Sequence, residues 1–155
     1  MRKNLQKGQT LFELLVAIAI GVVIITGIVI LTTLSIGNSN VSKNDANGLR
    51  YAQEGLEWVR AERDKSWATV IAKSSNSTSY YCISSLNWNT ASACNSSQVI
   101  TGTTYRRTLS LKSSDSDGNG QADTIDATIL IQWDDGGKQH ATQIATQLTS
   151  WKGQE

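Results

Sequence analysis

The chain has 155 residues, a net charge of +1 at neutral pH and no proline. This length suffices for one modest domain besides any anchor. Lysine and arginine are spread along the chain without a basic stripe, so nucleic acid is not indicated as a partner. No Ser/His/Asp set, histidine-rich metal cluster or phosphate-binding loop indicates an enzyme, so we expect a non-enzymatic protein.

An uncharged apolar run extends from Leu14 to Leu34. At about 1.5 Å of helix rise per residue it spans roughly 30 Å, the thickness of a bilayer's hydrocarbon core. A cleavable secretory signal has a shorter apolar region of roughly 7–15 residues, followed by a small-residue cleavage site. We therefore expect this run to remain in the mature chain as a transmembrane helix.

The charges that flank the run predict its orientation. Arg2, Lys3 and Lys7 precede it, and the next cation is Lys43. Because cytoplasmic flanks carry the excess of basic residues, the N-terminus is expected in the cytoplasm and the longer C-terminal part outside it. The chain is thus expected to be a single-pass protein of the cytoplasmic (inner) membrane.

A glutamate, Glu13, stands at the apolar edge of this run, where a charge costs less than the roughly 2.5–3.5 kcal/mol expected near the bilayer centre. It can be interpreted as a chance interfacial carboxylate. Its surroundings favour another interpretation. A short basic leader ends in Gly8, then Gln9 and Thr10 follow, and Glu13 is the fifth residue after the glycine.

With this arrangement, the segment "KGQTLFELLVAI" resembles the type IV pilin family, which includes the pseudopilins. The resemblance implies a leader over residues 1–8 and cleavage between Gly8 and Gln9 by a membrane prepilin peptidase. A glycine suits this position because a residue without a side chain lets the backbone enter a narrow cleft. The same enzyme usually methylates the new amine, here that of Gln9, although most major pilins begin with phenylalanine.

The resemblance also gives Glu13 a role in assembly. In the family this carboxylate faces the positive N-terminal amine of a neighbouring subunit. In a low-dielectric environment such pairing offsets much of the cost of burying the charge, so it favours docking in one register. The implied partners are the prepilin peptidase, other pilin subunits, the pilus assembly machinery and the membrane.

The fold implied is α+β: the pilin fold, with one long N-terminal helix packed on a small antiparallel β-sheet. Residues 9–34 would form the transmembrane and assembly half of the helix, and residues 35–68 a helical stem. We expect a helix from about Thr10 to Asp64, which the Gly37–Gly48 region could bend. The residues expected to pack on the exported domain recur at helical spacing: Leu49, Ala52, Leu56 and Val59.

Residues 69–155 are expected to form the exported β-domain, because their pattern changes to period two. The residues predicted to share a face are Tyr105, Arg107, Leu109 and Leu111; Ile125, Ala127, Ile129, Ile131 and Trp133; and Ile144, Thr146 and Leu148. These predict three strands, joined by the turn-like segments "KSSDSDGNGQAD" and "DDGGK". The lone histidine, His140, is expected to be a surface residue of the last strand.

A polar segment, residues 73–104, is predicted to be a loop. Its embedded aromatic residues either pin it to the sheet or form an exposed patch for other pilins or a substrate. The only two cysteines, Cys82 and Cys94, lie in it. In an oxidising exported compartment they are expected to form a disulfide worth roughly 3 kcal/mol, whereas a reducing setting would leave two free thiols.

The segment "DSDGNGQADTID", residues 115–126, resembles an EF-hand or dockerin-type calcium loop without the flanking helices. Ca²⁺ prefers six to eight oxygen ligands on a tightly turned loop. The candidate ligands are Asp115, Asp117, Asn119, Gln121, Asp123 and Asp126. The alternative is a strand connection that needs no ion, because Asp, Asn and Gly favour turns for backbone reasons. No cofactor is otherwise required, and Ca²⁺ is a possible one.

The function favoured by the sequence is that of a minor type IV pilin, a structural subunit cleaved by prepilin peptidase and assembled into a cell-surface pilus through its N-terminal helix. The segment "AQEGLEWVRAERDKSW" resembles V-type minor pilins, the pilus-modification proteins. One alternative is a pseudopilin of a type II secretion system. An alternative of another class is an uncleaved, membrane-anchored surface domain that binds a ligand.

Overall fold

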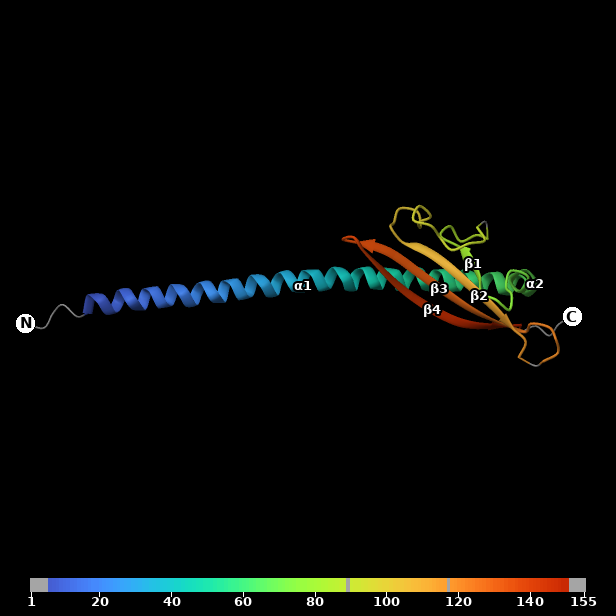
Figure 1. Cartoon of the computed structure of the whole chain (residues 1–155), viewed down its shortest axis with the longest axis horizontal. Coiled ribbons are helices and arrows are strands. Elements are labelled where there is room, and N and C mark those ends of the chain that lie inside the picture. The colour runs from blue at the N-terminus through green and yellow to red at the C-terminus, as the bar shows by residue number, and fades with distance from the viewer. Residues whose placement is uncertain (1–5, 89, 117, 151–155) are drawn as a thin grey trace, which may run out of the picture. The chain divides into compact units, whose positions relative to one another are not determined.

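The computed structural model describes residues 6–88, 90–116 and 118–150. Arg2 and Lys3 of the leader and the candidate ligand Asp117 lie outside these ranges. The elements in chain order are α1 (Gln6–Lys65), α2 (Trp67–Ile71), β1 (Ser79–Cys82), β2 (Arg106–Ser114), β3 (Thr124–Asp135) and β4 (Lys138–Thr149) (Figure 1). The chain forms two compact units that meet in sequence between Lys43 and Asn44.

The first unit contains the apolar part of α1, which confirms the predicted N-terminal helix. Its large aliphatic side chains are exposed on every side, as expected of a helix made for an apolar solvent. It is long and apolar enough to cross a membrane, by length and composition. The hydroxyls of Thr26, Thr32 and Thr33 bond back to carbonyls one turn earlier, at 2.8–2.9 Å. These polar groups are thus satisfied within the helix, as a lipid environment demands.

The second unit is built on a four-stranded antiparallel sheet in the order β1-β2-β3-β4. Consecutive strands are neighbours, so the sheet is the expected meander. Its register places Leu109 opposite Ile129, and Ile129 opposite Ile144, in one row across three strands. The alternation predicted from sequence is present: residues 125, 127, 129, 131 and 133 of β3 are all buried on one face.

The C-terminal part of α1, from Asn44 to Lys65, covers this face of the sheet and completes the α+β fold. Ala52, Leu56 and Val59 are buried there as predicted. The prediction for Leu49 was wrong, because its side chain remains 42% exposed. The buried face of the helix instead begins at Gly48, one residue earlier and therefore about 100° away around the helix axis.

Two glycines let α1 lie close to the sheet. A Cβ atom at Gly48 would come within 3.0 Å of Thr142 Cγ2 and Trp133 Cζ3, and one at Gly55 within 2.7 Å of Arg107 Cδ. A glycine inside a helix costs about 0.5–1 kcal/mol relative to alanine. At these positions the close contact with the sheet offsets that cost. The helix also continues through Gly37–Gly48, the region where the sequence allowed a bend.

The polar segment 73–104 contains a strand that the sequence prediction treated as loop. β1 pairs with β2 from Ser79↔Leu111 to Cys82↔Thr108, so the sheet has four strands rather than three. β1 has only four residues and lies at the sheet edge, so it is too short to show a periodic pattern. Before it, α2 is a single turn capped by Ser66, whose side chain accepts from Thr69 N–H.

Replacing Gly55 by valine is expected to destabilise the second unit. The new side chain would collide with the aliphatic part of Arg107 and press on Ile129, whose Cγ2 lies 3.4 Å from the position of a Cβ. Overpacking of this kind costs about 1–3 kcal/mol, more than the helix propensity gained by removing a glycine. The free energy of unfolding of residues 44–155, measured in urea by tryptophan fluorescence, should fall by about 2 kcal/mol.

The matched control is Gln53→Val, on the exposed side of the same helical segment. It should change the free energy of unfolding by less than about 0.5 kcal/mol. Equal effects of the two substitutions would show that the close contact at Gly55 does not matter.

Candidate functional site

The predicted processing and assembly residues lie at the start of α1. Gly8 and Gln9 belong to its first turns, and Glu13 follows about one turn later. The side chain of Glu13 is exposed, as are those of its apolar neighbours Phe12 and Leu14, at 69% and 60%. The structure records no ion pair between Glu13 and any described residue. A carboxylate on an apolar helix surface is costly in a low-dielectric environment unless an opposite charge lies near it.

In the second unit, the largest of the described side chains that are less than 2% exposed is that of Arg107 on β2, which is 1% exposed. Its Nη1 donates to the carbonyl of Tyr51 and to Glu54 Oε2, each at 3.0 Å, while Nε donates to the carbonyl of Ile83 at 3.2 Å. One guanidinium thereby connects the helix, the sheet and the start of the loop after β1. Burial lowers the pKa of Arg107, and the carboxylate of Glu54 opposes this shift.

Sequence reasoning placed Arg107 on the inner face of its strand but gave it no role. The signal was present, because an arginine at an inward position of an alternating strand needs partners in the core. The glycine at position 55 of the facing helix leaves the space for its side chain.

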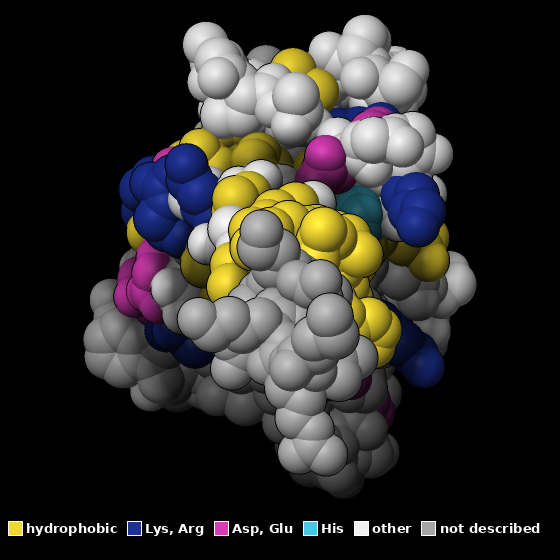
Figure 2. All heavy atoms as spheres, turned by 90° about the vertical axis from the view of Figure 1, so that its left-hand side faces the viewer, with side chains coloured by type: hydrophobic (Ala, Val, Ile, Leu, Met, Phe, Trp, Pro, Cys, Tyr) yellow, Lys and Arg dark blue, Asp and Glu magenta, His cyan; other side chains and the backbone are white. Residues whose placement is uncertain are grey.

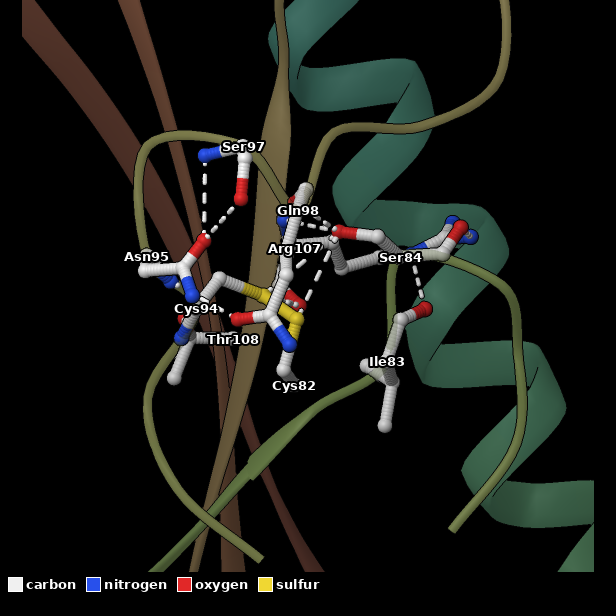
Figure 3. Close-up of a disulfide and its surroundings, with 9 residues drawn as sticks. All are labelled: Cys82, Ile83, Ser84, Cys94, Asn95, Ser97, Gln98, Arg107 and Thr108. Atoms are coloured by element: carbon white, nitrogen blue, oxygen red, sulfur yellow. Dashed lines mark hydrogen bonds between the residues drawn. A yellow bond between two sulfur atoms is a disulfide. The ribbon is translucent and has the colours of Figure 1, made fainter. Parts of the chain in front are cut away.

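The predicted disulfide between Cys82 and Cys94 is formed, with the two Cα atoms 4.6 Å apart. It ties the loop after β1 to the outer face of the sheet (Figure 3). Around it, Cys94 N–H donates to Thr108 Oγ1 at 3.1 Å, and Ser84 Oγ donates to the carbonyl of Gln98 at 2.8 Å. An open polar cavity of about 330 Å³ lies beside it, lined by Cys82, Ser84, Ser85, Asn87, Thr90, Ser97, Gln98 and Val99.

The aromatic residues of the segment 73–104 divide between the two interpretations offered for it. Trp88 packs on Trp58 of α1, with ring centroids 4.7 Å apart, and on Tyr81 at 5.3 Å. Its Nε1 also donates to Glu62 Oε2 at 2.9 Å. The hydrogen bond from Lys65 lowers the pKa of Glu62 most, and the hydrogen bond from Trp88 lowers it further. Trp88 and Tyr81 therefore pin the loop, whereas Tyr80 is 50% exposed.

The aspartate-rich loop between β2 and β3 is held by its own side chains. The carboxylate of Asp115 accepts from the N–H groups of Gly118 and Gly120, both at 2.7 Å. Asp123 accepts from the N–H and hydroxyl of Ser116, which lowers the pKa of Asp123. Gly118 and Gly120 have φ values of +75° and +84°, which favour glycine. These bonds fit the ion-free alternative, a turn stabilised by its own backbone.

The remaining candidate calcium ligands are not all brought together. Asn119 accepts from Gln121 N–H at 2.8 Å within the same loop. Asp126 lies on β3, where Gln147 Nε2 of β4 donates to it at 3.2 Å. Within the described ranges, no three His, Cys, Asp or Glu side chains form a group that could hold a metal ion. Asp117 lies outside those ranges, so the calcium hypothesis stays a prediction.

His140 is not the plain surface residue expected from sequence. It lies on the helix-covered face of β4, is half-buried, and stacks on Trp133 with ring centroids 5.7 Å apart. Asn44, where the second unit begins, is bonded to two other parts of that unit. Its Nδ2 donates to Asp135 Oδ2 at 3.1 Å, and its carbonyl accepts from Tyr105 Oη at 3.2 Å. His140 therefore belongs to the packing where α1 enters this unit.

Comparison with known proteins supports the interpretation of the N-terminal segment. Residues 3–35 match the family model described as the prokaryotic N-terminal methylation motif. Neither the search of curated proteins nor the search of solved structures found a match. The matched region contains Gly8, Gln9 and Glu13 together with the apolar helix. The chain therefore carries the prepilin signature of the type IV pilin and pseudopilin family.

Proposed function

We propose that the chain is a minor type IV pilin, a structural subunit that enters a fibre through its N-terminal helix. The observation that carries the proposal is the prepilin signature followed by an apolar helix whose one carboxylate, Glu13, has no ion-pair partner among the described residues. In the precursor the leader of residues 1–8 precedes the cleavage site. After cleavage the new amine of Gln9, with or without a methyl group, supplies the positive partner on a neighbouring subunit.

The exported unit fits this role because it folds around its own core. Its sheet, covering helix and disulfide need no second chain to complete them. The subunit is anchored in the inner membrane with its N-terminus in the cytoplasm and is then assembled into a surface filament. Its partners are the prepilin peptidase, the assembly machinery and other pilins. A pseudopilin of a type II secretion system would share all these features, and the V-type resemblance of residues 52–67 favours the pilus.

The loop of residues 115–126 is the proposed site for Ca²⁺ in this subunit. Asp115 and Asn119 lie on one tight loop, and the backbone carbonyl of Gln121 is close by in sequence. An incoming cation would take over carboxylate oxygens that now accept backbone N–H groups. The ion would stiffen the strand connection and is not required for the fold.

Cleavage after Gly8 is the first expected outcome. When the full chain is produced with a prepilin peptidase, the N-terminal peptide measured by mass spectrometry should begin at Gln9, and a methyl group would appear in the same spectrum. Gly8→Val should block the cut, because a branched side chain does not fit where the backbone must enter a narrow cleft. An intact N-terminus with active peptidase present would instead support an uncleaved surface anchor.

Glu13→Ala should separate processing from assembly. The variant should be cleaved like the unaltered chain, because Glu13 lies beyond the cut, but its amount in sheared filaments should fall by at least tenfold. The loss follows from the missing partner of the N-terminal amine of the neighbouring subunit. Leu15→Ala, also exposed on the apolar helix, is the control and should leave incorporation nearly unchanged. Normal incorporation of Glu13→Ala would contradict the assembly role.

Millimolar Ca²⁺ should raise the melting temperature of residues 44–155, and Asp115→Ala/Asp117→Ala should abolish the rise. The binding energy would come from carboxylate oxygens on the loop, which only the folded unit holds together. The control Glu57→Ala/Asp64→Ala removes two carboxylates of α1 and should leave the rise intact. Calorimetry without any shift at millimolar Ca²⁺ would show that the loop is an ion-free turn.

A further inference from the structure

The two edges of the sheet differ in how they are protected. β1, at one edge, has only four residues. Its outer side is partly occupied, because Cys82 N–H donates to the carbonyl of Thr90 at 3.0 Å and the disulfide fastens the same loop. β4, at the other edge, has 12 residues. The exported unit thus has one covered edge and one long edge.

β4 lacks the devices that usually prevent another strand from pairing with an edge. Such devices include prolines, bulges, charges along the strand and a covering segment. The chain has no proline, and every residue from Lys138 to Thr149 pairs one-to-one with β3, so there is no bulge. Lys138, at the first position, is the only lysine, arginine or carboxylate of the strand. No described segment pairs with its outer side.

The register shows which backbone groups of β4 point outward. Ile83 N–H donates to the carbonyl of Arg107 at 3.0 Å, so residue 107 directs its backbone groups towards β1. Residues alternate between the two sides of a strand, and facing residues in antiparallel strands bond in alternate pairs. The odd-numbered residues of β2 therefore face β1, and its even-numbered residues bond to even-numbered residues of β3. The odd-numbered residues of β3 then bond to the even-numbered residues of β4. The outward N–H and C=O groups belong to Gln139, Ala141, Gln143, Ala145, Gln147 and Thr149.

The side chains at this edge define the kind of strand that fits. On the helix-covered face, Ile144 is only half-buried, so it would gain an apolar neighbour on an added strand. On the other face, Ala141, Gln143 and Ala145 are exposed, uncharged and small or amide-bearing. A suitable partner is an extended segment with apolar residues on the helix side and polar residues on the other.

A second copy of this chain is a poor partner for β4. Head-to-tail pairing would use the edge of β1, where Cys82 is already bonded to Thr90 and only the backbone of Tyr80 faces outward between the strand ends. Antiparallel pairing of two β4 strands about a twofold axis would run the two covering helices, from Asn44 to Lys65, in opposite directions. In that arrangement the two N-terminal helices would point in opposite directions. Two subunits anchored in the same membrane, as proposed above, must have their N-terminal helices pointing in the same direction.

We infer that the free edge of β4 binds an extended strand of a different exported subunit, which continues the sheet by backbone hydrogen bonds. Such strand addition draws its affinity from main-chain bonds and its selectivity from alternate side chains. The inference rests on the proposed anchoring for the exclusion of a second copy. The backbone pattern of β4 stands independently of it.

The test uses the full chain in the cells that make it. A photoreactive benzoylphenylalanine replaces Gln143, beside the free edge, and in a control replaces Gln53, on the exposed side of α1. The crosslinked peptide is identified by mass spectrometry. Ala145→Pro removes an outward N–H and no bond to β3, and its ring blocks an approaching strand. Ala145→Val keeps the N–H and suits a strand. Ala141→Pro and Ala141→Val repeat the comparison at a second outward position.

The expected product at Gln143 joins the chain to an extended segment of one unlike subunit. Its yield should fall at least tenfold in both proline variants, remain in both valine variants, and be absent from the Gln53 control. The melting temperature of each variant shows that the fold persists. A product with a second copy, a yield indifferent to proline, or no product from chains cleaved after Gly8 would overturn the inference. The N-terminal mass in the same samples tests the processing separately, so a failed crosslink leaves the proposed function standing.

Discussion

A guanidinium buried between a helix and a sheet holds the second unit, residues 44–150, in one arrangement. Arg107 reaches across the core from β2 and bonds to the backbone of α1 and to the carbonyl of Ile83. A buried charge is tolerated only when it is paired and hydrogen-bonded, so removing a partner would leave an uncompensated charge. Gly55 is required by the same contact, because any side chain there would occupy the space of Arg107. The register of helix on sheet follows from this pair.

The N-terminal helix differs from this unit, since its carboxylate Glu13 lies exposed among apolar side chains. Its apolar side chains are exposed and its threonine hydroxyls are bonded internally. Glu13 has no such internal solution among the described residues. The chain therefore combines a unit that folds around its own core with a helix whose apolar side chains are exposed. Figure 2, viewed from the left-hand side of Figure 1, shows hydrophobic side chains at the surface of the chain.

Much of the fold could be predicted because it rests on periodicity. The apolar run, the helical spacing of Ala52, Leu56 and Val59, and the alternation along β3 each have one simple structural explanation. Leu49 was misplaced because a search for a hydrophobic stripe favours large side chains, whereas close helix–sheet contact selected Gly48. β1 was overlooked because four residues are too few to show an alternating pattern, and the strand is recognised by its pairing with β2.

The candidate site was predictable to a different degree in each part. The spacing of Gly8, Gln9 and Glu13 could be read directly from the sequence, whereas the structure records no ion pair between Glu13 and the described side chains. The disulfide followed from two cysteines and an oxidising compartment. The roles of Arg107 and of the Trp88–Glu62 bond depend on contacts between segments far apart in the sequence. No local pattern contains that information.

The close contact between Gly55 and Arg107 has a mechanical consequence. Arg107 sits where the helix has no side chain, and its guanidinium holds the carbonyl of Tyr51 one turn earlier. A slide of residues 44–65 over the sheet by one turn would bring the side chain of Val59, four residues after Gly55 on the same helix face, against Arg107. Both this close contact and the apolar packing therefore oppose a shift of the helix along the sheet, so the second unit should resist tension applied through its own helix.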